Sequence, residues 1–191
     1  MTRFFWVRHG PTHAKAMVGW TDLPADLTDH AAVHRLRSTL PAQAVTISSD
    51  LIRATATADA ICRGPRLPHD PTLRELHFGS WEMRSFAEIE AETPDHIRAF
   101  WEEPGQVRPP GGEGWDDLTQ RVWAATDRLA TAHPQSDIVV VAHFGAILAA
   151  LQRALDLTAP QVFAHRIDNL SVTELTLTPD GWQVGRINHC P

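Results

Sequence analysis

Residues 137–145 read DIVVVAHFG, in which the unbroken apolar run 138–142 is followed directly by His143. A run of this kind is typical of a central parallel strand that is covered on both faces. Residues 3–10, RFFWVRHG, repeat the arrangement, because an apolar run again ends in a histidine and is closed by the Gly10-Pro11 pair. Residues 145–155 then predict a helix. The two stretches therefore predict neighbouring strands of an α/β sheet, each ending in a polar turn.

The rest of the chain supplies the other elements of such a fold. Apolar residues at steps of three and four predict a long amphipathic helix over 115–132. The remaining expectations are helices over 30–40 and from Asp50, which would be the N-cap, one or two helices within 85–103, short strands at 44–48 and 73–76, and a hairpin formed by 171–177 and 182–187. This alternation predicts a three-layer α/β sandwich with a mostly parallel central sheet.

The chain length of 191 residues fits one domain, and no internal repeat or second core is evident. The middle of the chain is the least regular part, and residues 104–114 are dense in Pro and Gly. We therefore expect a single domain over 1–191, in which residues 77–114 form a small helical insertion or lid.

The composition excludes several classes of partner. The chain has 17 basic and 23 acidic residues and no dense Lys/Arg run, which argues against a nucleic-acid partner. No apolar run approaches the ~20 residues of a membrane span. Cys62 and Cys190 are the only cysteines and match neither a disulfide framework nor a zinc motif, so we expect a cytoplasmic protein without metal or cofactor. The oligomeric state stays open, a homodimer included.

Cationic and imidazole side chains follow three predicted strands. Arg8 and His9 come directly after the first strand, His143 follows the 137–142 strand, and Arg53 lies in the first turn of the helix after the 44–48 strand. In open α/β sheets, ligands bind outside the carboxyl ends of the strands. These residues are therefore expected to converge on one anionic ligand.

The same residues lie in motifs that, in order, resemble those of the histidine phosphatase, or phosphoglycerate mutase-like, superfamily. Arg8-His9-Gly10 with Thr12 resembles the opening signature of that family, and residues 48–58, SSDLIRATATA, resemble its second motif. Residues 73–82 (LRELHFGSWE), 110–113 (PGGE), 141–143 (VAH) and 169–175 (NLSVTEL) resemble the later ones. The resemblance covers nearly the whole chain, and the group it approaches most is that of the α-ribazole and broad-specificity phosphatases.

The resemblance implies a mechanism that the residue chemistry also supports. Neutral His9 would attack phosphorus and form a phosphohistidine, while Arg8, Arg53 and His143 bind the phosphate oxygens. We expect a bound phosphate to favour the His143 cation over the opposing helix N-terminus. Glu75 is the expected general acid, with Glu82 as the alternative. Thr12 and Asn169 would either contact phosphate or shape turns.

Three functions remain open on the sequence alone. The first is hydrolysis of a small phosphorylated metabolite, the second is phosphoglycerate mutase-type transfer, and the third is a silent phospho-ligand-binding module. Departures from the family pattern concern the pocket rather than the reacting groups. Pro11 replaces the Glu or Gln that often follows the opening signature, and Asp29-His30 stands where a Gly usually follows the Leu-Thr pair. Met83 replaces the Gly common after Trp-Glu, and Phe144 intervenes between His143 and Gly145. Trp81, Trp115 and Trp123 are expected to pack in the core rather than stack on substrate.

Overall fold

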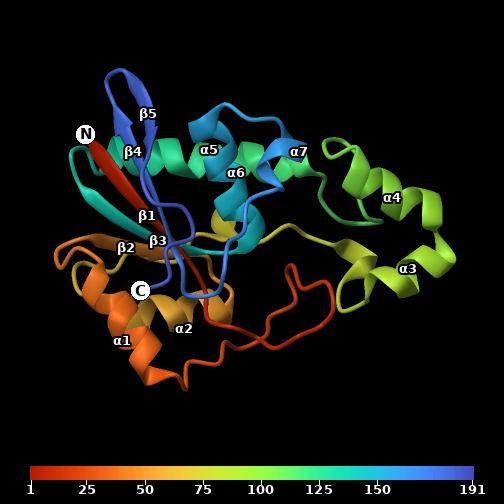
Figure 1. The fold of residues 1–191 in the computed structure, drawn as a ribbon, viewed down its shortest axis with the longest axis horizontal. Helices are drawn as coiled ribbons and strands as arrows, with labels where there is room; N and C mark the ends of the chain where they lie inside the picture. Colours follow the sequence, from red (N-terminus) through yellow and green to blue (C-terminus); the bar gives the residue numbers. More distant parts are fainter.

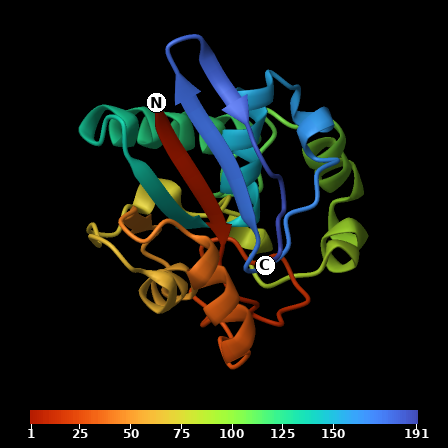
Figure 2. The same ribbon diagram turned by 60° about the vertical axis from the view of Figure 1, so that its left-hand side comes forward.

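The computed structural model describes all residues from 1 to 191, and five strands form its central sheet. The strand order is β2-β3-β1-β4-β5. In sequence order the strands are β1 (Thr2–Arg8), β2 (Val45–Ser48), β3 (Asp137–Ala142), β4 (Val172–Thr178) and β5 (Gly181–Val184). Strands β2, β3 and β1 are parallel, and the β4–β5 hairpin joins β1 in the antiparallel sense, as Figure 2 shows.

Helices cover both faces of the sheet, so the predicted three-layer sandwich is confirmed (Figure 1). One face carries α1 (His30–Thr39) and α2 (Ile52–Ile61), and the other carries α5 (Trp115–Ala132) and α6 (Phe144–Leu155), followed by the short α7 (Ala159–Val162). Side chains of β1 alternate between the two faces, as the period of a strand requires. Phe4 and Trp6 belong to the core under α5 and α6, whereas Phe5 and Val7 belong to the core under α1 and α2.

The register of the parallel strands places their carboxyl ends together. Arg8 pairs with Ala142 across β1 and β3, and Ser48 pairs with Val141 across β2 and β3. The next backbone groups continue this alignment, since the His9 N–H donates to the Ala142 carbonyl at 3.1 Å. His9 and His143 therefore leave adjacent strands side by side.

The middle of the chain, between β2 and β3, carries two helices that project to one side of the molecule (Figure 1). It holds two 3₁₀ turns, η1 (Pro71–Leu73) and η2 (Gly79–Trp81), and two helices, α3 (Phe86–Glu92) and α4 (Pro94–Glu102). None of the helices combines the length and hydropathy that a membrane crossing requires.

The strand predicted at 73–76 is wrong, because η1 ends at Leu73 and irregular backbone follows. The Arg121 guanidinium accounts for the difference. It donates to the carbonyls of Thr72, Arg74 and Glu75 at 2.9, 2.7 and 2.7 Å. A side chain from α5 thus satisfies the acceptors that a neighbouring strand would otherwise bind.

Two further boundaries differ from prediction. Asp50 does not cap α2: Leu51 occupies that position, and the Asp50 carboxylate instead binds Arg74 through two hydrogen bonds of 2.7 and 2.5 Å. The last strand ends at Val184 instead of 187, and the short α7 was not predicted. Met83, which stands where the family pattern has Gly, has a φ of 62°, in the left-handed region that favours glycine.

Candidate active site

His9 lies just beyond β1 with 7% of its surface exposed. Its Nδ1 is 2.6 Å from the Gly10 carbonyl oxygen. A carbonyl only accepts hydrogen bonds, so Nδ1 carries the proton and Nε2 keeps its lone pair. The backbone around the ring is also held, since the Asn169 amide donates to the His9 carbonyl at 2.8 Å and the Gly10 N–H donates to the Thr57 hydroxyl at 3.0 Å. The ring is therefore oriented with Nε2 as its unprotonated nitrogen.

Arg53 reaches His9 from the first turn of α2 and is 1% exposed. Its Nε donates toward His9 Nε2 over 3.3 Å, while its two terminal nitrogens donate to the carbonyls of Thr21 and Gly19 at 2.9 and 2.6 Å. The expectation that Arg53 points to the strand ends therefore agrees with this geometry. The two loop carbonyls thus hold the guanidinium so that its Nε points at His9 Nε2.

Arg8 comes to the same place from the end of β1. One terminal nitrogen donates to the Ile167 carbonyl at 2.6 Å, but Nε is buried without a hydrogen-bond partner. The guanidinium carbon lies 5.4 Å from the centre of the Phe144 ring. A buried donor without an acceptor is costly, and an anionic ligand is the natural acceptor for it.

His143 is fully buried at the start of α6, and its ring centre is 5.0 Å from that of His9. Its Nε2 is 2.6 Å from the Ser49 hydroxyl, whereas Nδ1 is buried and has no partner. Ser49 follows β2 as His143 follows β3, so both partners come from adjacent strand ends. This arrangement leaves one ring nitrogen of His143 free for a ligand.

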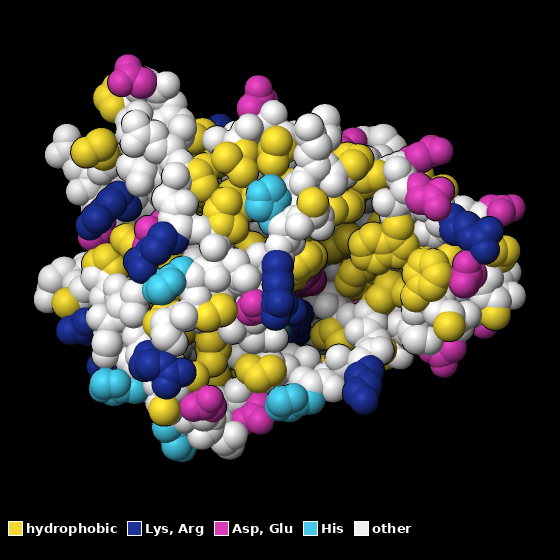
Figure 3. Space-filling model, viewed as in Figure 1, with side chains coloured by type: hydrophobic (Ala, Val, Ile, Leu, Met, Phe, Trp, Pro, Cys, Tyr) yellow, Lys and Arg dark blue, Asp and Glu magenta, His cyan; other side chains and the backbone are white.

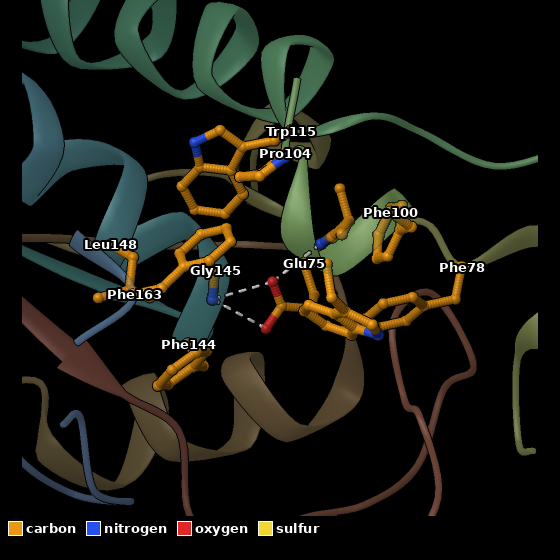
Figure 4. A pocket seen from close by; sticks show the side chains of 11 residues that line it. Glu75, Phe78, Phe100, Pro104, Trp115, Phe144, Gly145, Leu148 and Phe163 are labelled. Atoms are coloured by element: carbon orange, nitrogen blue, oxygen red, sulfur yellow. Dashed lines mark hydrogen bonds between the residues drawn. The ribbon is translucent and has the colours of Figure 1, made fainter. Parts of the chain in front are cut away.

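Glu75 contacts the start of α6 at Gly145, two residues after His143. Its carboxylate oxygens accept hydrogen bonds from the Gly145 N–H at 3.0 and 3.1 Å, and Oε1 also accepts one from the Leu76 N–H at 2.9 Å (Figure 4). A Cβ at Gly145 would come within 2.4 Å of Glu75 Oε1. Glycine directly after Phe144 therefore leaves room for the Glu75 carboxyl group beside the first turn of α6.

Glu82, the alternative acid, has a different environment. Its carboxylate accepts hydrogen bonds from three consecutive backbone N–H groups of the loop 19–21, from the Thr21 hydroxyl, and from the Phe78 N–H. These donors hold the pKa of Glu82 below its ordinary value, against the effect of burial. Glu82 thus ties the loop to the middle segment.

The electrostatics of the site favour neutral imidazoles and the binding of an anion. Burial lowers the pKa of His9 to about 3, and the charges of Arg53 and Arg8 add to the effect. Burial, followed by the neighbouring His9 and Arg53, also holds the pKa of His143 well below its ordinary value. Burial lowers the pKa of Arg8 and Arg53 as well, although a guanidinium remains charged. The cation expected on His143 would therefore need a bound anion.

These shifts predict that the ligand-free protein loses stability in mild acid. Both histidines have an ordinary pKa near 6.5 when unfolded and a depressed one when folded, so the unfolded chain binds more protons below about pH 6.5. The free energy of unfolding should fall by up to about 1.4 kcal/mol per pH unit for each histidine as the pH drops from 6.5 toward 4. Urea unfolding at pH 7 and pH 5, in phosphate-free buffer, measures this loss.

The matched comparison uses two variants. His143→Gln removes one of the two depressed groups and should flatten the pH dependence, whereas His34→Gln, at an exposed position of α1, should not. An unchanged pH dependence in His143→Gln would contradict the assignment of a neutral buried imidazole.

The other predicted residues contribute differently. Thr12 lies half-buried on the loop after His9, and Asn169 binds the His9 carbonyl. Ser49 and Thr57 of the second motif hold His143 and Gly10, and the sequence alone does not predict these roles. Their signals were positional: Ser49 directly follows a strand, and Thr57 lies one turn after Arg53. No group of three or more His, Cys, Asp or Glu side chains is placed to hold a metal ion.

An apolar cavity of about 290 Å³ adjoins Glu75. Figure 3 shows it as a hollow with hydrophobic walls, next to cationic side chains. Figure 4 shows the lining side chains around the Glu75 carboxylate. The cavity is bounded by Glu75, Leu76, Phe78, Phe100, Trp101, Pro104, Trp115, Phe144, Gly145, Leu148 and Phe163.

Sequence comparison identifies relatives of known family. The model of the histidine phosphatase superfamily (branch 1) matches residues 4–189. A bifunctional protein of Mycobacterium tuberculosis is 30% identical over 195 residues, which cover 94% of this chain and 51% of that protein. This chain thus spans about half the length of that relative. An adenosylcobalamin/alpha-ribazole phosphatase of Salmonella typhimurium is 28% identical over 174 residues, covering 87% of this chain and 86% of the relative.

Solved structures agree with the sequence relatives. The protein YhfR of Bacillus stearothermophilus superposes with a TM-score of 0.90 at 25% identity, covering 99% of this chain and 98% of the other. A mycobacterial glucosyl-3-phosphoglycerate phosphatase superposes with a TM-score of 0.81 at 27% identity, covering 99% of both chains. With both histidines, both arginines and the family match over residues 4–189 in place, the chain belongs to the histidine phosphatase superfamily, branch 1.

Proposed function

We propose that this protein is a phosphomonoesterase that hydrolyses a small phosphorylated metabolite through a phosphohistidine on His9. One observation carries the proposal: the lone pair of His9 Nε2 is buried beside two guanidiniums, and one of these has an unpartnered buried Nε. A neutral base next to fixed positive charge suits attack on a phosphate dianion. Arg8 and Arg53 bind the equatorial oxygens, as planar forks do.

In the first step, the Nε2 lone pair forms a bond to phosphorus while the ester P–O bond breaks. Glu75, protonated at this stage, gives its proton to the leaving alkoxide. In the second step, water attacks phosphorus, the P–N bond breaks, and the Glu75 carboxylate takes the proton from water. Inorganic phosphate leaves, and His9 is again neutral at Nε2.

The hydrogen-bond partners support Glu75 over Glu82 as the acid. Five donors enclose the Glu82 carboxylate, four from the loop 19–21 and one from Phe78. Glu75 accepts from two backbone N–H groups, those of Leu76 and Gly145, and it borders the cavity next to the phosphate site. A proton donor must touch the leaving oxygen, which a carboxyl group enclosed by loop donors does not.

His143 supplies a further phosphate donor. Either tautomer allows the 2.6 Å contact between Nε2 and the Ser49 hydroxyl, and in the cation Nε2–H donates to that hydroxyl while Nδ1–H is the donor left for the phosphate. Arrival of the phosphate dianion raises the basicity of the ring and favours the cation. Asn169 acts mainly through its bond to the His9 carbonyl, and its second amide N–H and the Thr12 hydroxyl complete the phosphate site.

We place these groups in one histidine phosphatase domain over residues 1–191, with 77–114 as a lid over the leaving group. The cavity supports this role, because Phe78, Phe100 and Trp101 of that segment face α6 across it. The two cysteines are free thiols, which supports a cytoplasmic setting. Neither a metal ion nor a nucleic-acid partner is part of the proposal.

The test is phosphate release from a panel of phosphomonoesters in the presence of EDTA, coupled to mass spectrometry of acid-sensitive phosphopeptides quenched at neutral to alkaline pH. We expect phosphate release and a phosphoryl group on the peptide that contains His9. Interconversion of phosphoglycerates with little free phosphate would establish mutase-type transfer instead. Turnover that requires an added divalent ion, or a phosphoryl group elsewhere, would overturn the mechanism.

A further inference from the structure

The PGGE motif at residues 110–113 has no part in the phosphate site, yet its last residue is tied to the segment that carries Glu75. Glu113 forms an ion pair with Arg121 of α5 at 2.8 Å, and the side chains of the two residues are only 19% and 16% exposed. Charges that lose so much of their hydration need complete hydrogen bonding to be tolerated. The hydrogen-bond partners of this pair therefore indicate what it holds in place.

The Arg121 guanidinium makes five hydrogen bonds within the protein, as many as it has N–H groups. Two of them go to the two carboxylate oxygens of Glu113, both at 2.8 Å. The other three go to backbone carbonyls of the segment 72–75. Arg8 differs, because its Nε is buried without a partner. Arg121 thus has no donor left for a phosphate and acts on the protein backbone alone.

Two of these carbonyls belong to the peptide groups on either side of the Glu75 Cα. The Arg74 carbonyl is 2.7 Å from one terminal nitrogen of Arg121, and the Glu75 carbonyl is 2.7 Å from the other. The indole Nε1 of Trp20 also donates to the Glu75 carbonyl, at 2.8 Å, so both lone pairs of that oxygen are bound. Because each peptide group is planar, holding both of them fixes the backbone dihedral angles of Glu75 and the direction of its Cα–Cβ bond.

Glu113 holds the backbone two residues further along the same segment. Its Oε2 accepts from the His77 N–H at 3.0 Å, and its own N–H donates to the His77 carbonyl at 2.8 Å. Gly112 makes this approach possible, because a Cβ at that position would lie 2.4 Å from the His77 carbonyl oxygen. The glycine and the glutamate of the motif therefore both anchor residues 75–77.

The irregular backbone around Glu75 makes such an anchor necessary. The turn η1 ends at Leu73, and no strand of the sheet lies within the residues that follow, up to η2. The Glu75 carboxylate must still lie beside the Gly145 N–H, as Figure 4 shows, and must reach the ester oxygen during the reaction. Misplacement of a reacting group by about 1 Å can lower a rate on the order of 100-fold, so supporting contacts decide how well such a group works.

We propose that Arg121, held by Glu113, is the residue that positions Glu75 for proton transfer to the leaving group. Arg121 touches neither the substrate nor the reacting atoms, and it acts through the peptide groups on both sides of Glu75. This inference rests on the proposed phosphomonoesterase function with Glu75 as its acid. Arg121 should then matter most for esters whose leaving group needs a proton.

The test compares benzyl phosphate with p-nitrophenyl phosphate, which each carry one ring and are similar in size. Benzyl alkoxide needs a proton to leave, whereas nitrophenolate leaves without one. In Arg121→Lys the ammonium has three donors and no planar fork, so it cannot hold both peptide groups and Glu113. We expect kcat/KM to fall about 30- to 100-fold for benzyl phosphate and to stay within about threefold of wild type for p-nitrophenyl phosphate. The ratio kcat/KM is the measure because it covers only the steps up to release of the alcohol.

Two further variants provide a second test and a control. Glu113→Gln keeps the guanidinium but removes one of the two oxygens that bind it, so kcat/KM for benzyl phosphate should fall about tenfold, again with little change for the nitrophenyl ester. Arg128→Lys is the matched control, about two turns further along α5. Arg128 donates to Asp70 and Thr72 at the start of the same segment but not to Glu75, so neither value should change more than about twofold.

The outcomes separate this proposal from the proposed function. No hydrolysis of any phosphomonoester by the wild-type protein would refute the function itself. Losses of equal size on both esters in Arg121→Lys would show that the residue serves only the fold, and wild-type values for both would show that Glu75 does not depend on it. Either result refutes the positioning role and leaves the phosphatase standing. Should Arg121→Lys fail to fold, the same comparison in Glu113→Gln decides.

Discussion

His9→Ala is expected to lower kcat by a factor on the order of 10⁴ to 10⁶, the range for loss of a covalent nucleophile, and to abolish the phosphoenzyme. The physical reason is that no other side chain presents an unprotonated lone pair at the same place. His143 is 5.0 Å away, centre to centre, but its ring is fully buried and its Nε2 is engaged by the Ser49 hydroxyl. Steady-state turnover and mass spectrometry of samples quenched at neutral to alkaline pH measure both effects.

Folding and binding need separate checks for this variant. Arg8, Arg53 and His143 remain, so His9→Ala should still bind inorganic phosphate by calorimetry within about tenfold of the wild-type affinity. His34→Ala, at an exposed site on α1, is the matched control and should keep full turnover. A His9→Ala protein that folds and binds phosphate yet keeps more than a few per cent of the wild-type rate would rule out the phosphohistidine.

The convergence of His9, Arg8, Arg53 and His143 was predictable because strand ends are encoded locally. Each follows a strand, or the first turn after one, and the parallel register brings these ends to one edge. The apolar runs also fixed the sandwich, since residues of β1 must be buried on both faces. Arg53 was placed correctly although the predicted cap, Asp50, was wrong, because strand β2 and helix α2 by themselves decide where the first turn lies.

The middle segment was not predictable in the same way because long-range partners decide its structure. A single guanidinium, Arg121, binds three carbonyls between Thr72 and Glu75, and no local pattern signals such a contact. Glu82 likewise owes its role to a loop 61 to 63 residues earlier in the chain. The cavity walls come from residues 75–78, from the region of α4, from α5 and α6, and from the end of α7, so only the folded chain assembles them.

Glu75→Gln should separate the two halves of the proposed reaction. The amide keeps an oxygen for the Gly145 N–H but cannot donate the acidic proton. For an alkyl phosphate, kcat should fall about 10²- to 10⁴-fold. For p-nitrophenyl phosphate, whose leaving group needs no protonation, phosphorylation of His9 should remain fast and hydrolysis of the phosphohistidine should become slow. Stopped-flow absorbance should then show a burst of one nitrophenolate per site.

Glu82→Gln provides the contrast that assigns the acid. Its amide nitrogen would face N–H groups that now donate to a carboxylate, so the main loss should be stability, with a lower thermal midpoint. Any loss of turnover should then be similar for alkyl and nitrophenyl esters, without a burst. If the burst instead appears in Glu82→Gln and not in Glu75→Gln, the acid is Glu82. In that case the Glu75 carboxylate, which accepts from the Gly145 N–H, has a structural role. The apolar cavity next to Glu75 would then not be the binding site of the leaving group.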